Sequence, residues 1–229
     1  MLKKLKLFRK AFFTDFIRFY YSQFGEDIIL GEILKKGSIG FYVDVGCYHP
    51  KKFSNTYMLY KKGWRGINID MEEDKIQLFN MVRPHDLNIL CPISDKEEEV
   101  TLYRFSKYGL GSSIDKKFAS QTADHLYDEA IVKTRTLNKV LNESPYKDTQ
   151  IDVLSIDAEG MDFKVLKSLD IKKYNPKVII IEDHHEKIDD ILATDTFKFL
   201  VKNNYKLRSW AFYSLIFVLP DSDILKQRG

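Results

Sequence analysis

Residues 41–50 read FYVDVGCYHP, and this stretch decides how the rest of the chain is interpreted. Its first five residues form a short apolar run with one acid, which is typical of a buried strand, and Gly46 follows at the turn. A turn that binds a dinucleotide carries further glycines, and Tyr48 and Pro50 stand where those would be expected. The stretch therefore predicts a strand that runs into a ligand-binding turn with a single glycine, or a buried strand followed by an ordinary turn.

Short apolar runs alternate with amphipathic segments along the rest of the chain. The runs expected to be strands are residues 66–70, 87–93, 100–105, 132–137, 151–157, 177–181, 205–210 and 215–219. The segments expected to be helices are residues 54–62, 71–82, 158–169 and 188–201. This alternation predicts an α/β fold with a mainly parallel central sheet and a C-terminal antiparallel hairpin.

The composition is that of a globular protein. The chain has 229 residues, of which 44% are hydrophobic and 30% charged, so we expect one domain with a sizeable core over residues 21–229. A formal net charge of +3 gives no support to nucleic-acid binding. Cys47 and Cys91 lack the spacing of a metal site, so we expect buried free thiols and a cytoplasmic protein. No apolar run approaches the roughly 20 residues that span a membrane.

Residues 1–20 are basic and aromatic and are expected to form an amphipathic N-terminal helix. Apolar side chains recur on one face of this helix, at Leu5, Phe8, Phe12, Phe16 and Phe19. The segment lacks the apolar stretch and the cleavage site of a signal peptide. Three roles are open: docking on the domain, formation of a homodimer, and peripheral contact with the inner face of a membrane.

An acidic residue closes nearly every strand of the predicted core. The carboxyl ends of parallel strands meet at one edge of the sheet, where ligands bind. A carboxylate buried there gains nothing unless something binds it. The strand-end residues are, in chain order, Asp44 with Gly46, Asp70, Ser94 with Asp95, Asp157 with Glu159, and Glu182 with Asp183. We therefore expect the functional site at this edge.

Asp44, Gly46 and Asp70 indicate a cofactor that contains a nucleoside. A glycine lets the turn approach a ligand closely, and an acid that ends the second strand is placed to accept hydrogen bonds from ribose hydroxyls. A pyrophosphate would need further glycines, which favours S-adenosylmethionine, whose positive charge also suits Asp44. A nicotinamide-dependent oxidoreductase on the same layout is the alternative enzyme.

Several segments resemble the FkbM family of S-adenosylmethionine-dependent methyltransferases. They are YSQFGEDIIL, VDVG, GWRGINID, ISDKEEEVTLY and IDVLSIDAEGMDFKVLKSL, within residues 21–183. The resemblance implies a Rossmann-like class I methyltransferase sandwich and methyl transfer to an oxygen, commonly of a sugar. The segment SNTYMLYKKGWRG is similar to members linked to polysaccharide biosynthesis. The sequence departs from the family at CYHP, where many members have a small residue, Asn and Gly.

The resemblance also implies roles for the strand-end residues. Asp44 and Gly46 would line the methionine end of the cofactor, and Asp70 would hold its ribose. Ser94 or Asp95 would contact the adenine amino group.

Four further residues receive roles from their positions. Ile93 would flank the adenine. Gln23 and Asp27 would close over the cofactor, and the alternative for these two residues is helix capping and surface solvation. Glu159 repeats the acid of the family element and is a cofactor-binding candidate, although a place in the first turn of a helix would also explain it.

Asp157, Glu182 and Asp183 end two strands that should be neighbours, so their carboxylates are candidate ligands of Mg²⁺ or a similar cation. A cation there would lower the pKa of a substrate hydroxyl, and His184 or His185 would take the proton. Asp157 is also a catalytic and a cofactor-binding candidate. The alternatives are that Asp157 only contacts the cofactor or orients the substrate, that Glu182 and Asp183 cap the following helix, and that both histidines are solvated.

The expected function is methylation of a hydroxyl on a sugar, nucleotide-sugar or polysaccharide precursor. The alternatives are another acceptor, with a phosphate-type oxygen or an amine, and a degenerate methyltransferase fold that serves as a scaffold at a membrane. A basic cluster would attract a phosphorylated acceptor or form a solvated face. Its members are Lys51, Lys52, Lys61, Lys62 and Arg65.

Overall fold

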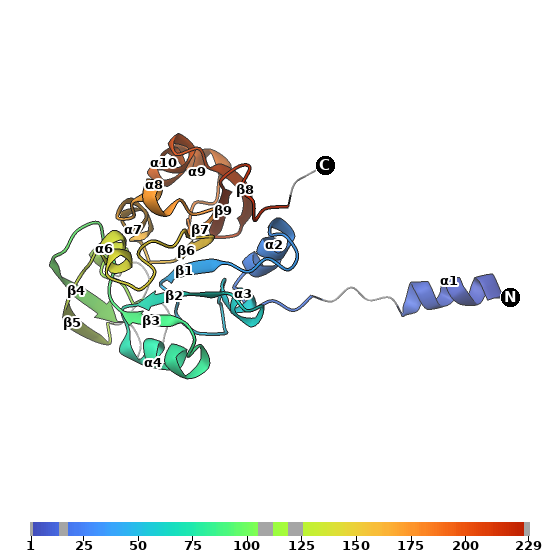
Figure 1. The fold of residues 1–229 in the computed structure, drawn as a ribbon, viewed down its shortest axis with the longest axis horizontal. Helices are drawn as coiled ribbons and strands as arrows, with labels where there is room; N and C mark the ends of the chain where they lie inside the picture. Colours follow the sequence, from blue (N-terminus) through green and yellow to red (C-terminus); the bar gives the residue numbers. More distant parts are fainter. Residues whose placement is uncertain (1, 14–17, 105–111, 119–125, 227–229) are drawn as a thin grey trace.

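A seven-stranded sheet forms the centre of the molecule (Figure 1). The computed structural model describes residues 2–13, 18–104, 112–118 and 126–226. The strands lie in the order β3 (Leu87–Leu90), β2 (Arg65–Asp70), β1 (Phe41–Val45), β6 (Val153–Ile156), β7 (Val178–Glu182), β9 (Ser214–Val218) and β8 (Lys206–Ala211). The first five in this order are parallel, and β9 is antiparallel to β7 and β8. The predicted mainly parallel sheet with a C-terminal hairpin is confirmed.

The central strands are apolar because helices cover both faces of the sheet. Every residue of β1 and β6 is buried. Alternate side chains of β1 point to opposite faces, so Val43 and Val45 join one apolar cluster and Tyr42 joins the other. The first cluster takes residues from α6 (Leu137–Asn142), α7 (Asp162–Lys167), α8 (Ile171–Tyr174), α9 (Ile188–Ala193) and α10 (Asp195–Lys202). The second takes residues from α2 (Glu26–Ile33) and α3 (Tyr57–Lys61), and α4 (Glu73–Val82) contacts β2 and β3.

Local backbone conformation corrects several predicted boundaries. The strand predicted at residues 87–93 ends at Leu90. The helix predicted at 188–201 is two helices, because Thr194 is extended and its side chain accepts the N–H of Phe197 to start α10. The helix predicted at 158–169 begins only at Asp162, since Glu159 (φ 50°) and Gly160 (φ 90°) are left-handed.

Strands β4 (Glu99–Arg104) and β5 (Asp128–Lys133) form a separate two-stranded antiparallel sheet. The extended segment predicted at residues 132–137 was therefore placed too late in the chain. The strand covers residues 128–133, and helix α6 begins at Leu137. This small sheet stands beside the carboxyl ends of the main strands in Figure 1.

Helix α1 (Leu2–Phe12) has no buried residue and lies apart from the sheet and its helices in Figure 1. Phe16, which the sequence places on its apolar face, is outside the described residues. No helix in the described part of the chain is long and apolar enough to cross a membrane.

Candidate active site

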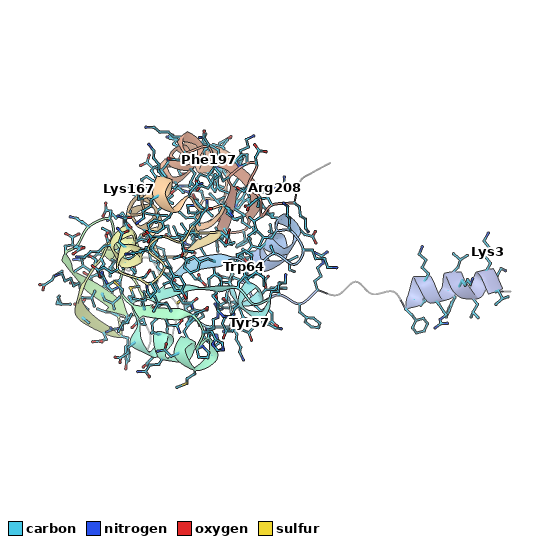
Figure 2. The ribbon with its side chains drawn as sticks, viewed as in Figure 1. Lys3, Tyr57, Trp64, Lys167, Phe197 and Arg208 are labelled. Carbon is cyan, nitrogen blue, oxygen red and sulfur yellow. The ribbon has the colours of Figure 1, made fainter. Side chains whose placement is uncertain are left out.

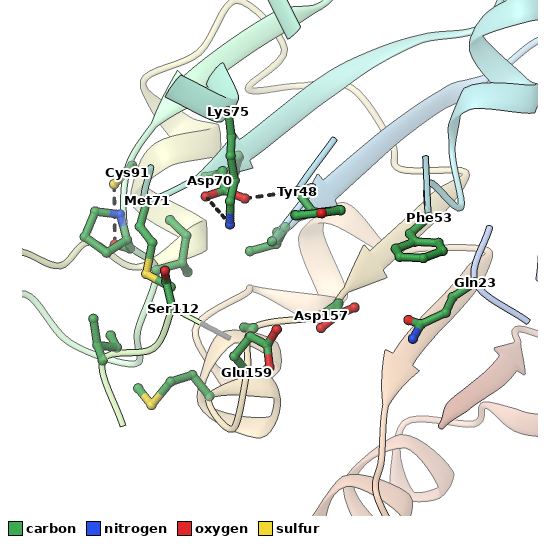
Figure 3. Close-up of a pocket in the computed structure, with 18 residues that line it drawn as sticks. Gln23, Tyr48, Phe53, Asp70, Met71, Lys75, Cys91, Ser112, Asp157 and Glu159 are labelled. Carbon is green, nitrogen blue, oxygen red and sulfur yellow. Dashed lines mark hydrogen bonds and ion pairs between the residues drawn. The ribbon is translucent and has the colours of Figure 1, made fainter. Parts of the chain in front are cut away.

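A pocket opens at the carboxyl ends of β1, β2 and β6 (Figure 3). Strands β2 and β6 flank β1 on opposite sides, so the chain leaves β1 at the point where open α/β sheets bind ligands. The hollow measures about 750 Å³ with its open mouth. Its lining residues include Gln23, Gly46, Tyr48, Phe53, Asp70, Met71, Lys75, Cys91, Ile93, Ser112, Asp157, Glu159 and Met161.

Asp70 ends β2 and faces the pocket, as predicted. Its Oδ2 accepts the backbone N–H of Tyr48 at 3.0 Å, and its Oδ1 accepts that of Glu72 at 3.0 Å. The ammonium of Lys75 lies 3.6 Å from Oδ1. Burial raises the pKa of Asp70, and the charge of Lys75 opposes that rise. The carboxylate is thus held in one orientation with acceptor capacity left over.

The turn after β1 needs its single glycine to let two strand ends meet. Gly46 has φ +75°, and a Cβ there would lie 1.7 Å from the backbone oxygen of Asp157. Tyr48 also has a left-handed backbone (φ 51°), and its N–H to Asp70 stabilises that conformation. The ring of Tyr48 stacks on Phe53 with centroids 6.2 Å apart. One position where a dinucleotide-binding turn would carry glycine is therefore occupied here by Tyr48, whose ring lines the pocket.

Asp44 does not line the pocket, which corrects the prediction made for it. The side chains of Val45 and Asp44 point to opposite faces because they are neighbours on a strand. The Asp44 carboxylate accepts the Thr56 hydroxyl at 2.5 Å in a buried polar network. Burial raises the pKa of Asp44, and the hydrogen bond from Thr56 and the nearby Arg83 oppose it.

Ser94 and Asp95 also lie outside the pocket. Because β3 ends at Leu90, the chain has turned away by residue 94, and Ser94 is buried with its N–H bonded to the Arg135 carbonyl. Asp95 Oδ2 lies 3.5 Å from the ammonium of Lys167. The preceding residues, Cys91 to Ile93, line the pocket instead. Both cysteines are buried free thiols, as predicted.

Gln23 and Asp27 separate in the structure. Gln23 lines the pocket, on the side of Phe53 in Figure 3. Asp27 lies outside it, and its carboxylate accepts the Tyr21 N–H and the Ser22 hydroxyl, both at 2.8 Å. Asp27 is therefore neither a helix cap nor a solvated residue: it is buried, and its carboxylate holds the preceding segment against the start of α2.

Asp157, Glu182 and His184 form a connected group at the ends of β6 and β7. Asp157 lines the pocket, and its carboxyl shares a hydrogen bond with that of Glu182. Burial raises the pKa of Asp157 well above its usual range, and the charge of Glu182 adds to that rise. Burial raises the pKa of Glu182 to about 9, the charges of Asp162 and Glu159 add to that rise, and the hydrogen bond with Asp157 opposes it. The pair therefore holds a proton at neutral pH. His184 Nε2 lies 3.2 Å from Glu182 Oε2, at ion-pair distance but without hydrogen-bond geometry.

The predicted trio of metal ligands is not brought together. Glu182 and Asp183 are consecutive at the end of a strand, so their side chains diverge. Asp183 Oδ1 accepts the His185 N–H at 2.9 Å and lies 2.7 Å from His185 Nδ1. Among the residues that the structure describes, no group of three or more His, Cys, Asp or Glu side chains is arranged to hold a metal ion. His185 is paired with Asp183 and does not line the pocket.

Glu159 lines the pocket, but from a turn rather than from a helix. Asp162 accepts the N–H groups of Ala158 at 2.7 Å and Gly160 at 3.2 Å, and this closes the turn. The Ser113 hydroxyl donates to the Glu159 carbonyl at 2.7 Å. A place in the first turn of a helix therefore accounts for the acid at position 162. It does not account for Glu159, which lies before α7 begins.

Sequence reasoning missed several lining residues. Tyr48 was noted only as a missing glycine, and Lys75 only as part of a helix. Ser112 comes from a segment beside the small sheet, where no local pattern signals a pocket.

Within the predicted basic cluster, Lys52 lies 4.7 Å from the centroid of the Phe53 ring at the pocket wall. The Lys61 ammonium instead donates to the Tyr21 hydroxyl at 2.8 Å.

This strand order, with a pocket at the carboxyl ends of β1, β2 and β6, is that of a Rossmann-like methyltransferase. A family model described as "Methyltransferase FkbM domain" matches residues 44–207, which is more than half of the chain. The protein belongs to the FkbM methyltransferase family, and the resemblance seen in the sequence is confirmed. No curated protein matches the chain. The family match sets aside the nicotinamide-dependent alternative.

Proposed function

We propose that the protein transfers a methyl group from S-adenosylmethionine to a hydroxyl of a sugar, nucleotide-sugar or polysaccharide precursor. The observation that carries the proposal is Asp70, whose two oxygens each accept one backbone N–H and keep a further lone pair. A carboxylate held in this way is suited to accept hydrogen bonds from two neighbouring ribose hydroxyls.

The rest of the pocket has side chains that suit such a cofactor. Ile69, Met71 and Ile93 offer an apolar wall for a flat base. The carboxyl group of Asp157, beside the Gly46 turn, offers negative charge to the positively charged methionine end of the cofactor. When bound, the cofactor supplies an electrophilic methyl group on a positively charged sulfur. It has no pyrophosphate, so a turn with one glycine is sufficient.

The Asp157–Glu182 pair is the proposed acceptor of the hydroxyl proton. A pair that holds one proton keeps one carboxylate free to accept another, and its raised pKa values suit a base near neutral pH. His184, about half exposed at 49%, lies on the solvent side of Glu182 and offers the proton a way out. A cation at this site would balance the negative charge of the two carboxyl groups. The proton that the pair holds already reduces that charge, so the geometry gives no support to a role for Mg²⁺.

Two lysines in or beside the pocket lining support an acceptor that carries a phosphate. Lys75 lines the pocket, and Lys52 lies over the ring of Phe53. Such charges would attract a nucleotide-sugar or a lipid-linked sugar. A phosphate-type oxygen or an amine as acceptor, and a scaffold without activity, are the outcomes that would replace this proposal.

Calorimetric titration with S-adenosylhomocysteine tests the cofactor assignment. We expect the wild-type protein to bind it, and Asp70→Ala to weaken binding at least about tenfold, because hydrogen bonds to a charged group are lost. Asp70→Asn, which keeps the shape, should also weaken binding. Asp95→Ala is the matched control, since Asp95 is an acid that the sequence also placed at a strand end but that lies outside the pocket, and it should bind like the wild type.

A wild-type protein that does not bind S-adenosylhomocysteine would overturn the proposal and favour the scaffold. If Asp95→Ala weakened binding and Asp70→Ala did not, the cofactor site would not lie at the end of β2. The melting temperature of each variant, measured alongside, separates loss of binding from loss of folding.

A further inference from the structure

Helix α1 carries an apolar face that nothing in the described chain covers. Every residue of α1 is exposed, and its largest apolar side chains include Phe8 (53% exposed) and Phe12 (69%). Figure 2 shows its side chains, Lys3 among them, projecting into open space away from the domain. Docking on its own domain, one of the three roles expected from the sequence, is therefore not seen. Exposure of several large apolar groups together marks an interaction surface.

Three apolar side chains of α1 share one face and three lysines share the opposite side, while Leu7 and Phe13 lie outside that apolar face. Leu5, Phe8 and Phe12 follow each other three and four residues apart and so share one face, where the rings of Phe8 and Phe12 lie 4.7 Å apart. The charged residues are Lys3, Lys4, Lys6, Arg9 and Lys10, and no acidic residue precedes Asp15 in the sequence. Lys3, Lys6 and Lys10 lie opposite that face by the same spacing.

We propose that α1 binds an anionic lipid surface, with Leu5, Phe8 and Phe12 inserted at the level of the headgroups. An amphipathic helix with aromatic and leucine side chains on one face and lysines on the other has the chemistry of an interfacial helix. Eleven residues make a helix of about 16 Å, which is too short to cross a bilayer and long enough to lie in its surface. The cations add attraction to anionic headgroups at the edge of that face.

Charge favours a lipid surface over a second copy of the chain. In a symmetric dimer, the same patch of both copies meets. Two α1 helices packed through their apolar faces would bring Lys4 and Arg9 of both copies, at the edges of that face, close together without an acid to pair with them. A membrane with anionic lipids offers the opposite charge and an apolar layer together. This inference is independent of the proposed methyl donor and acceptor.

The test is flotation of the full-length protein with vesicles of phosphatidylcholine alone or mixed with phosphatidylglycerol. We expect binding only to the mixed vesicles, and weaker binding at high salt because exposed charges are screened. Phe8→Ser with Phe12→Ser should lower the partition coefficient at least about tenfold. The matched control is Met81→Ser with Ile131→Ser, which removes two apolar side chains of similar exposure (75% and 70%) from the domain. That control should bind like the wild type.

A charge series tests the second half of the proposal. Replacing three lysines of α1 by Gln should lower partition about 100-fold, since each cation near the surface contributes. The changes are Lys3→Gln, Lys6→Gln and Lys10→Gln, and the control changes are Lys133→Gln, Lys172→Gln and Lys202→Gln on the domain. Both triple variants take the net charge from +3 to 0 (3 − 3), so a difference between them reports position and not total charge.

Two outcomes would overturn the proposal. Equal flotation of the wild type and the Phe8→Ser, Phe12→Ser variant would exclude insertion of this face. The second outcome has two parts: the wild type does not bind vesicles, and it is a dimer in light scattering that the same double substitution converts to a monomer. That outcome would show that α1 binds a second copy of the chain. Because no α1 residue is buried, the variants should keep the wild-type melting temperature and S-adenosylhomocysteine affinity.

Discussion

Gly46 joins two strand ends that are far apart in the chain. Its N–H donates to the Ile69 carbonyl at 2.9 Å, and its α-carbon lies against the backbone of Asp157. The residue therefore holds the ends of β1, β2 and β6 at the spacing that forms the pocket floor. A side chain has no room there, and the positive φ adds strain for any residue other than glycine.

Gly46→Ala should destabilise the protein by more than about 3 kcal/mol, because the new Cβ would meet a backbone oxygen that cannot move without the strand. Chemical denaturation measures the change. Gly31→Ala is the control: Gly31 lies in helix α2 with open space around the added Cβ, so this variant should gain up to about 1 kcal/mol. Equal stability of the two variants would contradict the close approach.

At the scale of elements, Arg83 holds the segment between β1 and α3. Its five N–H groups make five hydrogen bonds, two of them to the Pro50 carbonyl and the others to Ser54, Thr56 and Asn68. The side chain is fully buried, and its guanidinium also lies against aromatic rings, among them Phe79 at 4.9 Å. The segment that Arg83 holds carries Tyr48 and Phe53 into the pocket wall.

Arg83→Met should lower the free energy of unfolding by about 3 kcal/mol, because buried acceptors lose their donor. Arg83→Lys should rescue little, since an ammonium lacks the fork of five donors. Binding of S-adenosylhomocysteine should weaken in both, as Tyr48 and Phe53 lose their support. Arg208→Met, on the edge strand β8, is the control and should change neither quantity. A fully stable Arg83→Lys would show that charge alone matters at this position.

At the scale of the whole molecule, the Asp157–Glu182 pair links global stability to pH. The pKa of Glu182 is about 9 in the folded protein and near 4.5 when the chain is unfolded. Between these values the folded state holds a proton that the unfolded state has lost. The free energy of unfolding therefore falls as pH rises through this window, and levels off above it.

Glu182→Gln should flatten that pH dependence, because the amide does not titrate. From about pH 6 to about pH 8, the wild type should lose roughly 1–2 kcal/mol more than the variant. Denaturation midpoints across this range provide the measurement. Glu186→Gln, at an exposed site in the same loop, should follow the wild-type curve. Parallel curves for Glu182→Gln and the wild type would show that the pair is not protonated.

Much of the fold was predictable because it depends on local patterns. The buried runs at β1, β6 and β7 read directly as strands, since a parallel sheet covered on both faces needs continuous apolar residues. Asp70, Gly46, Asp157, Glu159 and Gln23 were predicted and do line the pocket. Position relative to a strand end was the signal for all of these except Gln23, and it failed at Asp44, where the predicted end was right but the side chain points to the other face.

The failures share a physical cause. Asp44, Asp183, Ser94 and Asp95 were judged by closeness in sequence to a strand end, but the direction of a side chain alternates along a strand and changes where the strand stops. Tyr48 and Ser112 reach the pocket through turns and through the small β4–β5 sheet, which have no periodic signature. Arg83 gave no signal, because the four acceptors of its five hydrogen bonds come from other parts of the chain.

The sequence by itself determined the strands of the central sheet, the family and the acidic edge of the sheet, because these follow from periodicity and local chemistry. The tertiary structure alone decided which acids face the pocket and which are paired inside the protein. It also showed that α1 leaves its apolar face uncovered. Those outcomes depend on contacts between residues distant in the chain, such as Gly46 with Asp157 and Arg83 with Pro50, which no local pattern records.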